Sequence, residues 1–357
     1  MPLDDVAGLN ASDRLTIVVT TSPIPSHPSP ALLRTLFASF RANLPQLDAC
    51  PRILVCDGYE LPKGRKQLCS EEAYEGFLAA AKDLQASGDL GPCKILRLGS
   101  CHGYGLALSA ALAEVATEYV LVVQHDWIFV REVLMSQAVA AMDADPCVKY
   151  VGMQSLTTLD YARRMELRYN LMLPPCRCVS GIRLVPQLLW YDKPHICRAQ
   201  HYRQVVLPEA NMDILQNPER RYGVDKMWPR LRNAEKLEEE HLHYGTFFWD
   251  VGVEVVYHLS GRKLRADAGY TALGGEERLG LPAGHLRGEA TTTATFTAVA
   301  ADRMMEVAGL SAPQEKGPAA RSFKGRCYLC GEKGHSKNHC KLQGDLPKGP
   351  PEVVAGC

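Results

Sequence analysis

Four short apolar runs near the start of the chain most limit what it can fold into. Each run is rich in valine, isoleucine and leucine, as expected of strands that are buried on both faces. The runs cover residues 15–20, 52–56, 93–98 and 119–123, and helical patterns lie between them at residues 30–40, 74–85 and 105–117. Strands that alternate with helices in this way predict an α/β sandwich with a mainly parallel central sheet.

Polar or glycine residues follow each run. Because parallel strands end at the same edge of a sheet, and ligands of such sheets bind there, we expect these residues to gather at one site. They are Thr20 and Thr21, Asp57 and Gly58, His102, Gly103 and Gly105, and Gln124, His125 and Asp126. Gly103 and Gly105 begin a G-x-G pattern. A dinucleotide-binding fingerprint has its third glycine where this chain has Leu108, which disfavours an NAD enzyme.

Between residues 14 and 130 this order resembles the GT-A glycosyltransferases, of the family-2-like type. The segment Val120-Leu-Val-Val-Gln-His-Asp126 is similar to the strand that carries the acidic D-x-D motif of that family. The resemblance implies a GT-A-like, Rossmann-type fold and a nucleotide-sugar donor. It also implies that Thr20, Thr21, Asp57 and Gly103 bind the nucleotide, and that Asp126 holds Mn²⁺ or Mg²⁺.

The motif departs from the family at its first acidic position, which Gln124 occupies. One carboxylate remains, and a hard cation would then take its other oxygen ligands from diphosphate and water. The alternative for Asp126 is a helix N-cap, a frequent role of aspartate after a strand.

After residue 150 the pattern becomes irregular and aromatic, as expected of an acceptor-binding half. The segment Arg220-Arg-Tyr-Gly-Val-Asp225 resembles the acidic segment that supplies the base in inverting GT-A enzymes, so Asp225 is the candidate base and Asp250 the second choice. Asp225 could instead be a surface residue that is paired with Arg221 or Lys226. By the same resemblance, His258 is expected to complete the metal site and Arg262 to meet the diphosphate, although His258 could also be a satisfied histidine at a strand end. Trp249 and Tyr244 could stack on a sugar or belong to the core.

A cysteine-rich array near the C-terminus carries a second chemistry. It reads Cys327-Tyr-Leu-Cys330-Gly-Glu-Lys-Gly-His335-Ser-Lys-Asn-His-Cys340. Three thiolates and one imidazole are a structural ligand set for Zn²⁺, and a segment this short needs the metal to fold. The alternatives are a chance cluster of cysteines, or His339 as the fourth ligand in place of His335.

This array resembles the retroviral-type CCHC zinc knuckle at all four ligands and at both glycines. Such knuckles bind single-stranded nucleic acid, RNA more often than DNA, by base stacking and phosphate contacts. Tyr328 and Leu329 would form the stacking platform, and Lys333 and Lys337 would meet phosphates. Some knuckles bind proteins instead, which is the alternative partner.

The chain has 357 residues, 46% of them hydrophobic, and equal numbers of acidic and basic side chains, so it has no overall attraction to nucleic acid. We expect no signal peptide and no membrane span, and a reducing compartment, cytoplasmic or nuclear, because the array needs intact thiolates. The expected domains are a glycosyltransferase-like unit at 12–285, a closing helix or extension at 286–310, a linker at 311–323, the knuckle at 324–342 and a disordered tail at 343–357.

The sequence therefore predicts an enzyme that moves a sugar from a nucleoside diphosphate to an acceptor hydroxyl, with an appended zinc knuckle. The alternative is a non-catalytic, zinc-dependent nucleic-acid-binding protein on a degenerate α/β scaffold, which Gln124 favours. Convergence of Asp126, His258 and Asp225 on one cleft would favour the enzyme, and their dispersal would leave the enzyme hypothesis with little support.

Overall fold

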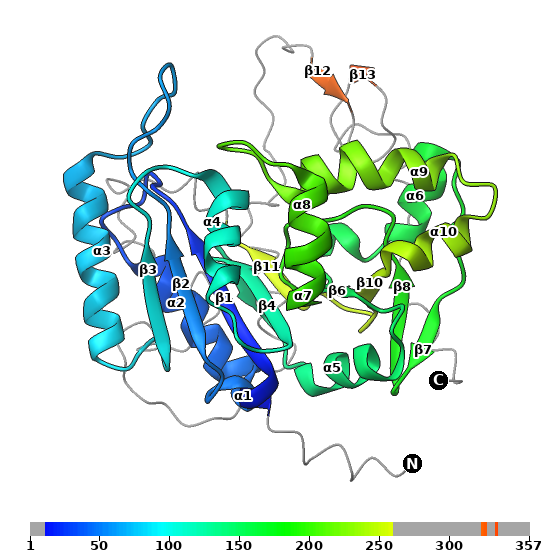
Figure 1. Cartoon of the computed structure of the whole chain (residues 1–357), viewed down its shortest axis with the longest axis horizontal. Coiled ribbons are helices and arrows are strands. Elements are labelled where there is room, and N and C mark those ends of the chain that lie inside the picture. Colours follow the sequence, from blue (N-terminus) through cyan, green and yellow to red (C-terminus); the bar gives the residue numbers. More distant parts are fainter. Residues whose placement is uncertain (1–10, 260–322, 327–332, 335–357) are drawn as a thin grey trace, which may run out of the picture.

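The computed structural model describes residues 11–259, 323–326 and 333–334 (Figure 1). All four predicted N-terminal strands and the three helices between them are present. The strands are β1 (Leu15–Thr21), β2 (Arg52–Cys56), β3 (Cys93–Arg97) and β4 (Tyr119–Gln124), and the helices are α2 (Ala31–Asn43), α3 (Glu71–Ala86) and α4 (Gly103–Ala113). A four-residue helix, α1 (Ala11–Arg14), precedes β1 and a short 3₁₀ turn, η2 (Pro45–Leu47), follows α2.

A nine-stranded mixed sheet forms the centre of the molecule, in the order β3-β2-β1-β4-β9-β6-β10-β8-β7. Its second half consists of β6 (Tyr150–Gly152), β7 (Arg177–Val179), β8 (Ile182–Pro186), β9 (His195–Arg198) and β10 (Thr246–Trp249). The first four strands pair parallel, whereas β9 is antiparallel to both β4 and β6, and β8 is antiparallel to β10 and β7. Seven of the nine strands thus point the same way, so the predicted mainly parallel sheet is present with two reversed strands.

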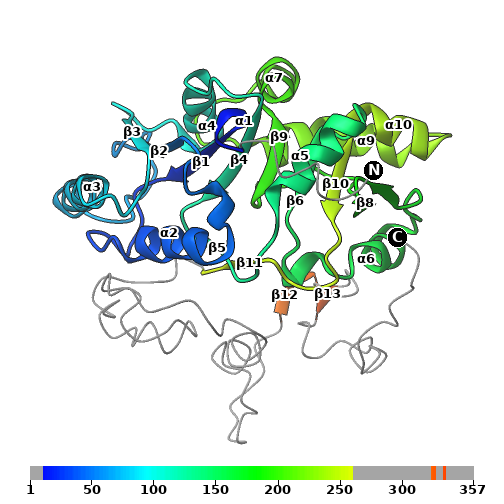
Figure 2. The same cartoon turned by 90° about the horizontal axis from the view of Figure 1, so that it is seen from below.

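Alternate residues of β1 feed two separate cores. Ile17 and Val19 belong to the cluster that contains Phe37 of α2, whereas Val18 belongs to the cluster that contains Leu108 of α4. The residues of β1 divide in this way because successive side chains of a strand face opposite sides of the sheet. All of these side chains are buried. Figure 2 shows α2 and α3 on one face of the sheet, with α4 and α7 (Ala199–His201) on the other. The sheet is therefore the middle layer of a three-layer sandwich.

The second half of the chain adds helices around the reversed strands. They are α5 (Met135–Ala144), η3 (Leu156–Thr158), α6 (Tyr161–Tyr169), the π-helical η4 (Tyr202–Val206), α8 (Leu207–Ala210), the π-helical η5 (Glu219–Met227), α9 (Trp228–Arg232) and α10 (Leu237–Tyr244). At the end of α10, Gly245 has φ +63°, and a Cβ there would lie 2.0 Å from the carbonyl oxygen of Cys147. Only glycine fits this left-handed turn, which sends the chain directly into β10.

A two-stranded ribbon of β5 (Trp127–Phe129) and β11 (Val256–His258) lies outside the main sheet and pairs antiparallel. In the described part of the chain, no helix is both long and apolar enough to cross a membrane.

Most of the zinc-knuckle prediction falls outside the described residues. The residues outside are the four expected zinc ligands Cys327, Cys330, His335 and Cys340, and the expected nucleic-acid contacts Tyr328, Leu329 and Lys337. Arg262, the expected diphosphate contact, also lies outside the described residues. The described pieces are β12 (Phe323–Arg326) and β13 (Lys333–Gly334), which pair antiparallel on either side of residues 327–332. The zinc site and the domain limits beyond residue 259 remain predictions of the sequence.

Candidate functional site

The sheet reverses its strand order between β1 and β4. From β1 the chain proceeds outward through β2 to β3, and then returns through α4 to place β4 on the other side of β1. In open α/β sheets, ligands bind in the crevice at the carboxyl ends of the strands at such a switch point. A cleft of about 510 Å³ lies there.

Residues that follow all four N-terminal strands line this cleft, as the sequence predicts. From here on it is called the switch-point cleft. Its polar and glycine lining comprises Thr20, Thr21, Ser22, Asp57, Arg65, Lys66, Gln67, Gly103, Tyr104, Gln124, His125, Asp126 and Asn217. Thr20, Thr21, Asp57, Gly103 and Asp126 are therefore gathered at one place.

Asp126, which lines the cleft, is in contact with His258, which does not line it. Asp126 follows β4, and His258 is the last residue of β11, which pairs with β5 directly after Asp126. The Leu259 N–H donates to the Asp126 carbonyl at 2.8 Å and so fixes the end of the ribbon. As a result His258 Nε2 lies 3.1 Å from Asp126 Oδ2. The alternative of a helix N-cap at Asp126 is wrong, because a strand follows it.

The geometry of this pair fits a divalent cation. Two ligands at right angles on an ion with bonds of about 2.1 Å stand about 3.0 Å apart, close to the observed separation. Asp126 is only 8% exposed, and its other oxygen, Oδ1, has no hydrogen-bond partner among the described residues. Leaving a buried carboxylate oxygen without a partner is costly, and coordination to a cation would relieve that cost.

The pair cannot enclose a cation alone. Among the described residues, no group of three or more histidine, cysteine, aspartate or glutamate side chains is placed to hold a metal ion. The remaining coordination positions would therefore belong to ligand oxygens and water. A site of this kind binds metal together with a phosphate-bearing ligand rather than as a closed protein cage.

The ionisation of Asp126 suits this use. Burial acts to raise the pKa of Asp126, but the hydrogen bond from His258 and the nearby imidazole of His125 outweigh it and bring the pKa below the usual value. The carboxylate is thus charged at neutral pH.

Asp57 lines the cleft and also has a structural role there. Its Oδ1 accepts from the backbone N–H groups of Gly58 at 2.9 Å and His102 at 2.7 Å, and its Oδ2 accepts from Gly103 at 2.8 Å. These bonds tie the end of β2 to the start of α4. Gly103 itself has φ +75°, and a Cβ there would lie 2.5 Å from the Leu215 Cα. Asp57 therefore shapes the wall of the cleft as well as lining it.

Gln124, the departure from the acidic motif, has a structural bond of its own. Its Nε2 donates to the Asp192 carbonyl at 2.9 Å and connects β4 to the segment before β9. An aspartate or glutamate here could not make this bond, because an ionised carboxylate donates no hydrogen.

Asp225 does not line the switch-point cleft. It lies in η5, where Arg220 Nε approaches it at 3.1 Å and Arg221 Nη1 at 3.2 Å. The pairing with Arg221 that the sequence left open is present. Among the described residues, Asp126 and His258 therefore converge, and Asp225 is held by two guanidinium groups instead.

Glu219, at the start of the same segment, contacts Asp192, which the cleft residue Gln124 also contacts, and the sequence did not single it out. Its Oε2 accepts from the Asp192 N–H at 3.2 Å, next to the carbonyl that Gln124 contacts. Burial raises the pKa of Glu219, and it raises the pKa of Asp192 far above the usual range, with Glu219 as a further cause. A lone glutamate after a proline carries no periodic signal, so its burial could not be foreseen.

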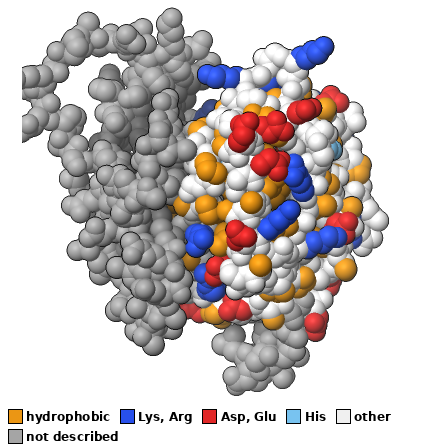
Figure 3. Space-filling view, turned by 90° about the vertical axis from the view of Figure 1, so that its left-hand side faces the viewer, with side chains coloured by type: hydrophobic (Ala, Val, Ile, Leu, Met, Phe, Trp, Pro, Cys, Tyr) orange, Lys and Arg blue, Asp and Glu red, His pale blue; other side chains and the backbone are white. Residues whose placement is uncertain are grey.

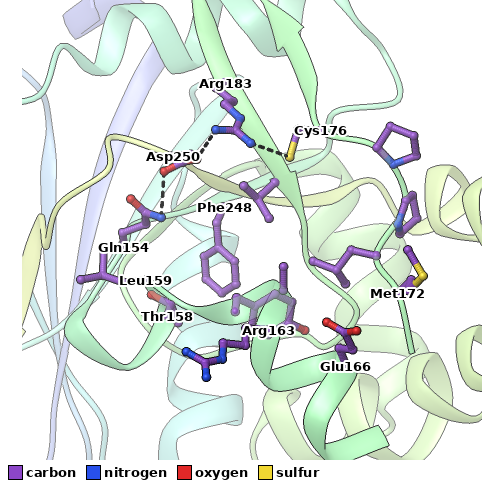
Figure 4. A pocket seen from close by; sticks show the side chains of 16 residues that line it. Gln154, Thr158, Leu159, Arg163, Glu166, Met172, Cys176, Arg183, Phe248 and Asp250 are labelled. Carbon is purple, nitrogen blue, oxygen red and sulfur yellow. Dashed lines mark hydrogen bonds and ion pairs between the residues drawn. The ribbon is translucent and has the colours of Figure 1, made fainter. Parts of the chain in front are cut away.

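Asp250 lies in a second cleft, also of about 510 Å³, which Figure 4 shows from close by. This cleft lies beside β6, β8 and β10, with Phe248 and Tyr161 among its apolar lining. Asp250 Oδ2 pairs with Arg183 at 3.3 Å, and Asp250 Oδ1 accepts from Gln154 Nε2 at 3.3 Å. The carboxylate is thus held at the rim of a cleft with an apolar floor.

Lys193 lines neither cleft but contacts residues that are sequence neighbours of both linings. Its Nζ donates to Ser155 Oγ at 2.9 Å and to Thr157 Oγ1 at 2.6 Å, beside the second cleft, and lies 5.9 Å from the ring centroid of Trp127, which follows Asp126. Burial lowers the pKa of Lys193 to about 8. The partly buried ammonium group of Lys193 thus contacts residues that adjoin, in the sequence, lining residues of both clefts.

Two aromatic candidates for sugar stacking belong to the core instead. Trp249 is 6% exposed and Tyr244 is 2% exposed. Neither offers a ring face to a ligand, so the interpretation of both as core residues is confirmed.

No protein-family model matches this chain, and no curated protein matches it. Among solved structures it is similar to the mannosyltransferase PcManGT of Pyrobaculum calidifontis, in complex with GDP-Man and Mn²⁺ (14% identity, TM-score 0.37, 54% of this chain and 46% of that chain). It is also similar to TarS of S. aureus with UDP-GlcNAc (14%, 0.38, 72% and 61%) and to glucosyl-3-phosphoglycerate synthase of Mycobacterium tuberculosis with Mn²⁺, UDP-Glc and glycerol 3-phosphate (10%, 0.36, 72% and 76%). The chain spans less than two thirds of the first structures that it matches. The three structures contain GDP-Man, UDP-GlcNAc and UDP-Glc respectively, but their TM-scores lie below 0.5, so the similarity carries no argument about the site of this chain.

Proposed function

We propose that this chain is a glycosyltransferase that moves a sugar from a nucleoside diphosphate donor to an acceptor hydroxyl. One observation carries the proposal: Asp126, which lines the switch-point cleft, is in contact with His258, and its other, buried carboxylate oxygen has no hydrogen-bond partner in the described structure. A site with two protein ligands and room for phosphate oxygens is what a cation that bridges protein and diphosphate needs.

The residues of the cleft divide the work of donor binding. Thr20, Thr21 and Gly103 would contact the nucleotide, and Asp57 would hold the cleft wall through its three backbone hydrogen bonds. Asp126 and His258 would hold Mn²⁺ or Mg²⁺, which supplies positive charge to the departing diphosphate. Arg262 stays a proposed diphosphate contact on the sequence resemblance alone.

In the transfer, the acceptor oxygen forms a bond to the anomeric carbon while the bond from that carbon to the diphosphate oxygen breaks. The acceptor proton must pass to a base. We assign this role to Glu219, because its carboxylate accepts from the N–H of Asp192, the residue whose carbonyl the cleft residue Gln124 contacts, and because burial raises the pKa of Glu219. Asp225, the candidate from the sequence, is neutralised by two arginines, and Asp250 stands at the second cleft, where we place the acceptor.

The direct test is donor cleavage. Purified full-length protein would be incubated with UDP- and GDP-sugars and Mn²⁺, and release of nucleoside diphosphate would be followed with and without candidate acceptors. We expect release from at least one donor, and loss of that release in Asp126→Asn but not in Asp83→Asn, an exposed aspartate on α3. No release from any donor, or equal release by both variants, would contradict the proposal. The protein would then be better described as a nucleic-acid-binding protein on an inactive scaffold.

The second part of the proposal is that residues 324–342 form a CCHC zinc knuckle that binds single-stranded RNA. The spacing of Cys327, Cys330, His335 and Cys340 supports it. We expect one zinc ion per chain and binding of a fluorescent single-stranded RNA, both lost in Cys327→Ser while Cys69→Ser, at a free cysteine of the large domain, keeps both. RNA affinity that survives Cys327→Ser would remove RNA binding from the knuckle and leave a protein partner as its target.

A further inference from the structure

The loop between β2 and α3 carries three cations over a short stretch: Lys63, Arg65 and Lys66. Arg65 and Lys66 line the switch-point cleft, together with Leu61, Gln67 and Leu68 of the same loop. Figure 3 shows lysine and arginine side chains at the protruding tip at the top of the molecule. The loop was not predicted to take part in the site.

The base of this loop is anchored, whereas its cationic side chains are not. Gln67 Nε2 donates to the Tyr59 carbonyl at 2.9 Å, and the Tyr59 hydroxyl donates to the Cys69 carbonyl at 2.9 Å. Arg65 and Lys66 are exposed, and neither forms an ion pair with any residue that the structure describes. Their charge is therefore available to a ligand in the cleft.

The remainder of the cleft offers a diphosphate few other donors. A helix N-terminus is the usual backbone cradle for phosphate, but at α4 the N–H groups of His102 and Gly103 already donate to Asp57, and the Gly105 N–H donates to the Gln216 carbonyl at 3.1 Å. Three backbone donors at the start of α4 are thus already used, so we expect side chains or a cation to supply most contacts to a phosphate in this cleft.

The metal site also holds less charge than a motif with two acidic residues would provide. Gln124 removes one carboxylate, and Asp126 with His258 leaves a cation anchored by two protein ligands. A cation held in this way depends on the diphosphate for its other ligands, so a second source of positive charge would keep the nucleotide bound when the ion is absent.

We propose that Arg65 and Lys66 bind the diphosphate of the donor and retain the nucleotide in the cleft without a divalent cation. This inference rests on the proposed function, and it adds that donor binding is only partly metal-dependent. Arg65 and Lys66 of the loop and Asp126 after β4 all line the cleft, so a ligand there can contact the loop and the proposed cation together.

The experiment is isothermal titration of the full-length protein with UDP, UMP and uridine, and with the GDP series, each in Mn²⁺ and in EDTA. The wild type should bind a nucleoside diphosphate in EDTA, more weakly than in Mn²⁺. The double variant Arg65→Ala/Lys66→Ala should lose about tenfold or more of this affinity in EDTA, since two charge-assisted contacts are removed. Its affinity for the free nucleoside should not change. The matched control is Lys63→Ala, in the same loop but outside the lining of the cleft, which should stay within about twofold of the wild type.

The outcomes separate the inference from the proposed function. If the wild type binds nucleotide in Mn²⁺ and the double variant binds as well as the wild type in EDTA, or no worse than Lys63→Ala, the inference is wrong and the proposed function stands. The same holds if the wild type binds in Mn²⁺ but not at all in EDTA, or if nucleoside affinity falls as much as diphosphate affinity. If the wild type binds no nucleotide in either condition, the proposed function fails as well.

Discussion

His258 Nε2 lies 3.1 Å from Asp126 Oδ2, although 132 positions separate the two residues. The antiparallel pairing of β11 with β5 brings them together, since His258 is in register with Trp127, the residue after Asp126. A long-range ribbon therefore assembles the site, and the contact is a property of the fold rather than of neighbouring sequence.

His258→Ala should weaken Mn²⁺ binding in the presence of nucleotide by about tenfold or more, because it removes one of two protein ligands. A manganese titration at saturating nucleoside diphosphate measures this. The control is His243→Ala, an exposed histidine at the end of α10. Equal manganese affinity in both variants would remove His258 from the metal site.

Asp57→Ala should lower the free energy of unfolding by about 3 kcal/mol, because three backbone N–H groups lose their acceptor near the cleft wall. Urea unfolding measures this change, and the control Asp83→Asn should have a free energy of unfolding close to that of the wild type. A variant as stable as the wild type would show that water or the neighbouring backbone replaces the carboxylate, and that Asp57 matters to the ligand alone.

Asp192→Asn should stabilise the protein increasingly as pH rises. Burial raises the pKa of Asp192 well above its usual value, so between the two values the folded chain keeps a proton that the unfolded chain has lost. The folded state then binds more protons, and the contribution of Asp192 to stability falls as pH increases. Asparagine cannot ionise and removes this loss. Urea unfolding at pH 4, 6 and 8 should therefore show the variant gaining on the wild type from pH 4 to pH 8, and a constant difference across that range would contradict the raised pKa.

Glu219→Gln should lower the turnover of sugar transfer by about 100-fold or more, because a general base typically contributes roughly 10² to 10⁴-fold to the rate. Nucleotide affinity should change little. Asp225→Asn should keep most of its turnover, because two arginines already hold that carboxylate. Transfer kinetics at saturating donor compare the two. The reverse order, with Asp225→Asn the more damaged, would restore the assignment made from the sequence.

The switch-point cleft could be predicted because its residues follow four strands with a strong apolar pattern. Thr21, Asp57, Gly103 and Asp126 needed only the rule that parallel strands end at one edge. His258 was found through a resemblance, and the structure supplies its physical reason in the pairing of β11 with β5.

The second half of the sheet could not be predicted in the same way. Strands β6 to β9 are three to five residues long, and β9 inserts antiparallel between β4 and β6, so its pairing depends on long-range contacts rather than on a local pattern. The surroundings of two charged residues could not be predicted for a related reason. Whether Asp225 faces a ligand or Arg221 depends on the π-helical turn that carries both, and Arg65 lies in a loop without periodicity.

The central claim is a cation-assisted nucleoside diphosphate site at Asp126. The most direct measurement is isothermal titration of the full-length protein with UDP and GDP, with and without Mn²⁺, for the wild type, Asp126→Asn and Asp83→Asn. We predict that Mn²⁺ strengthens binding of at least one nucleotide in the wild type and in Asp83→Asn, and that Asp126→Asn loses this gain. Binding that Mn²⁺ does not strengthen, or a gain that survives in Asp126→Asn, would contradict it.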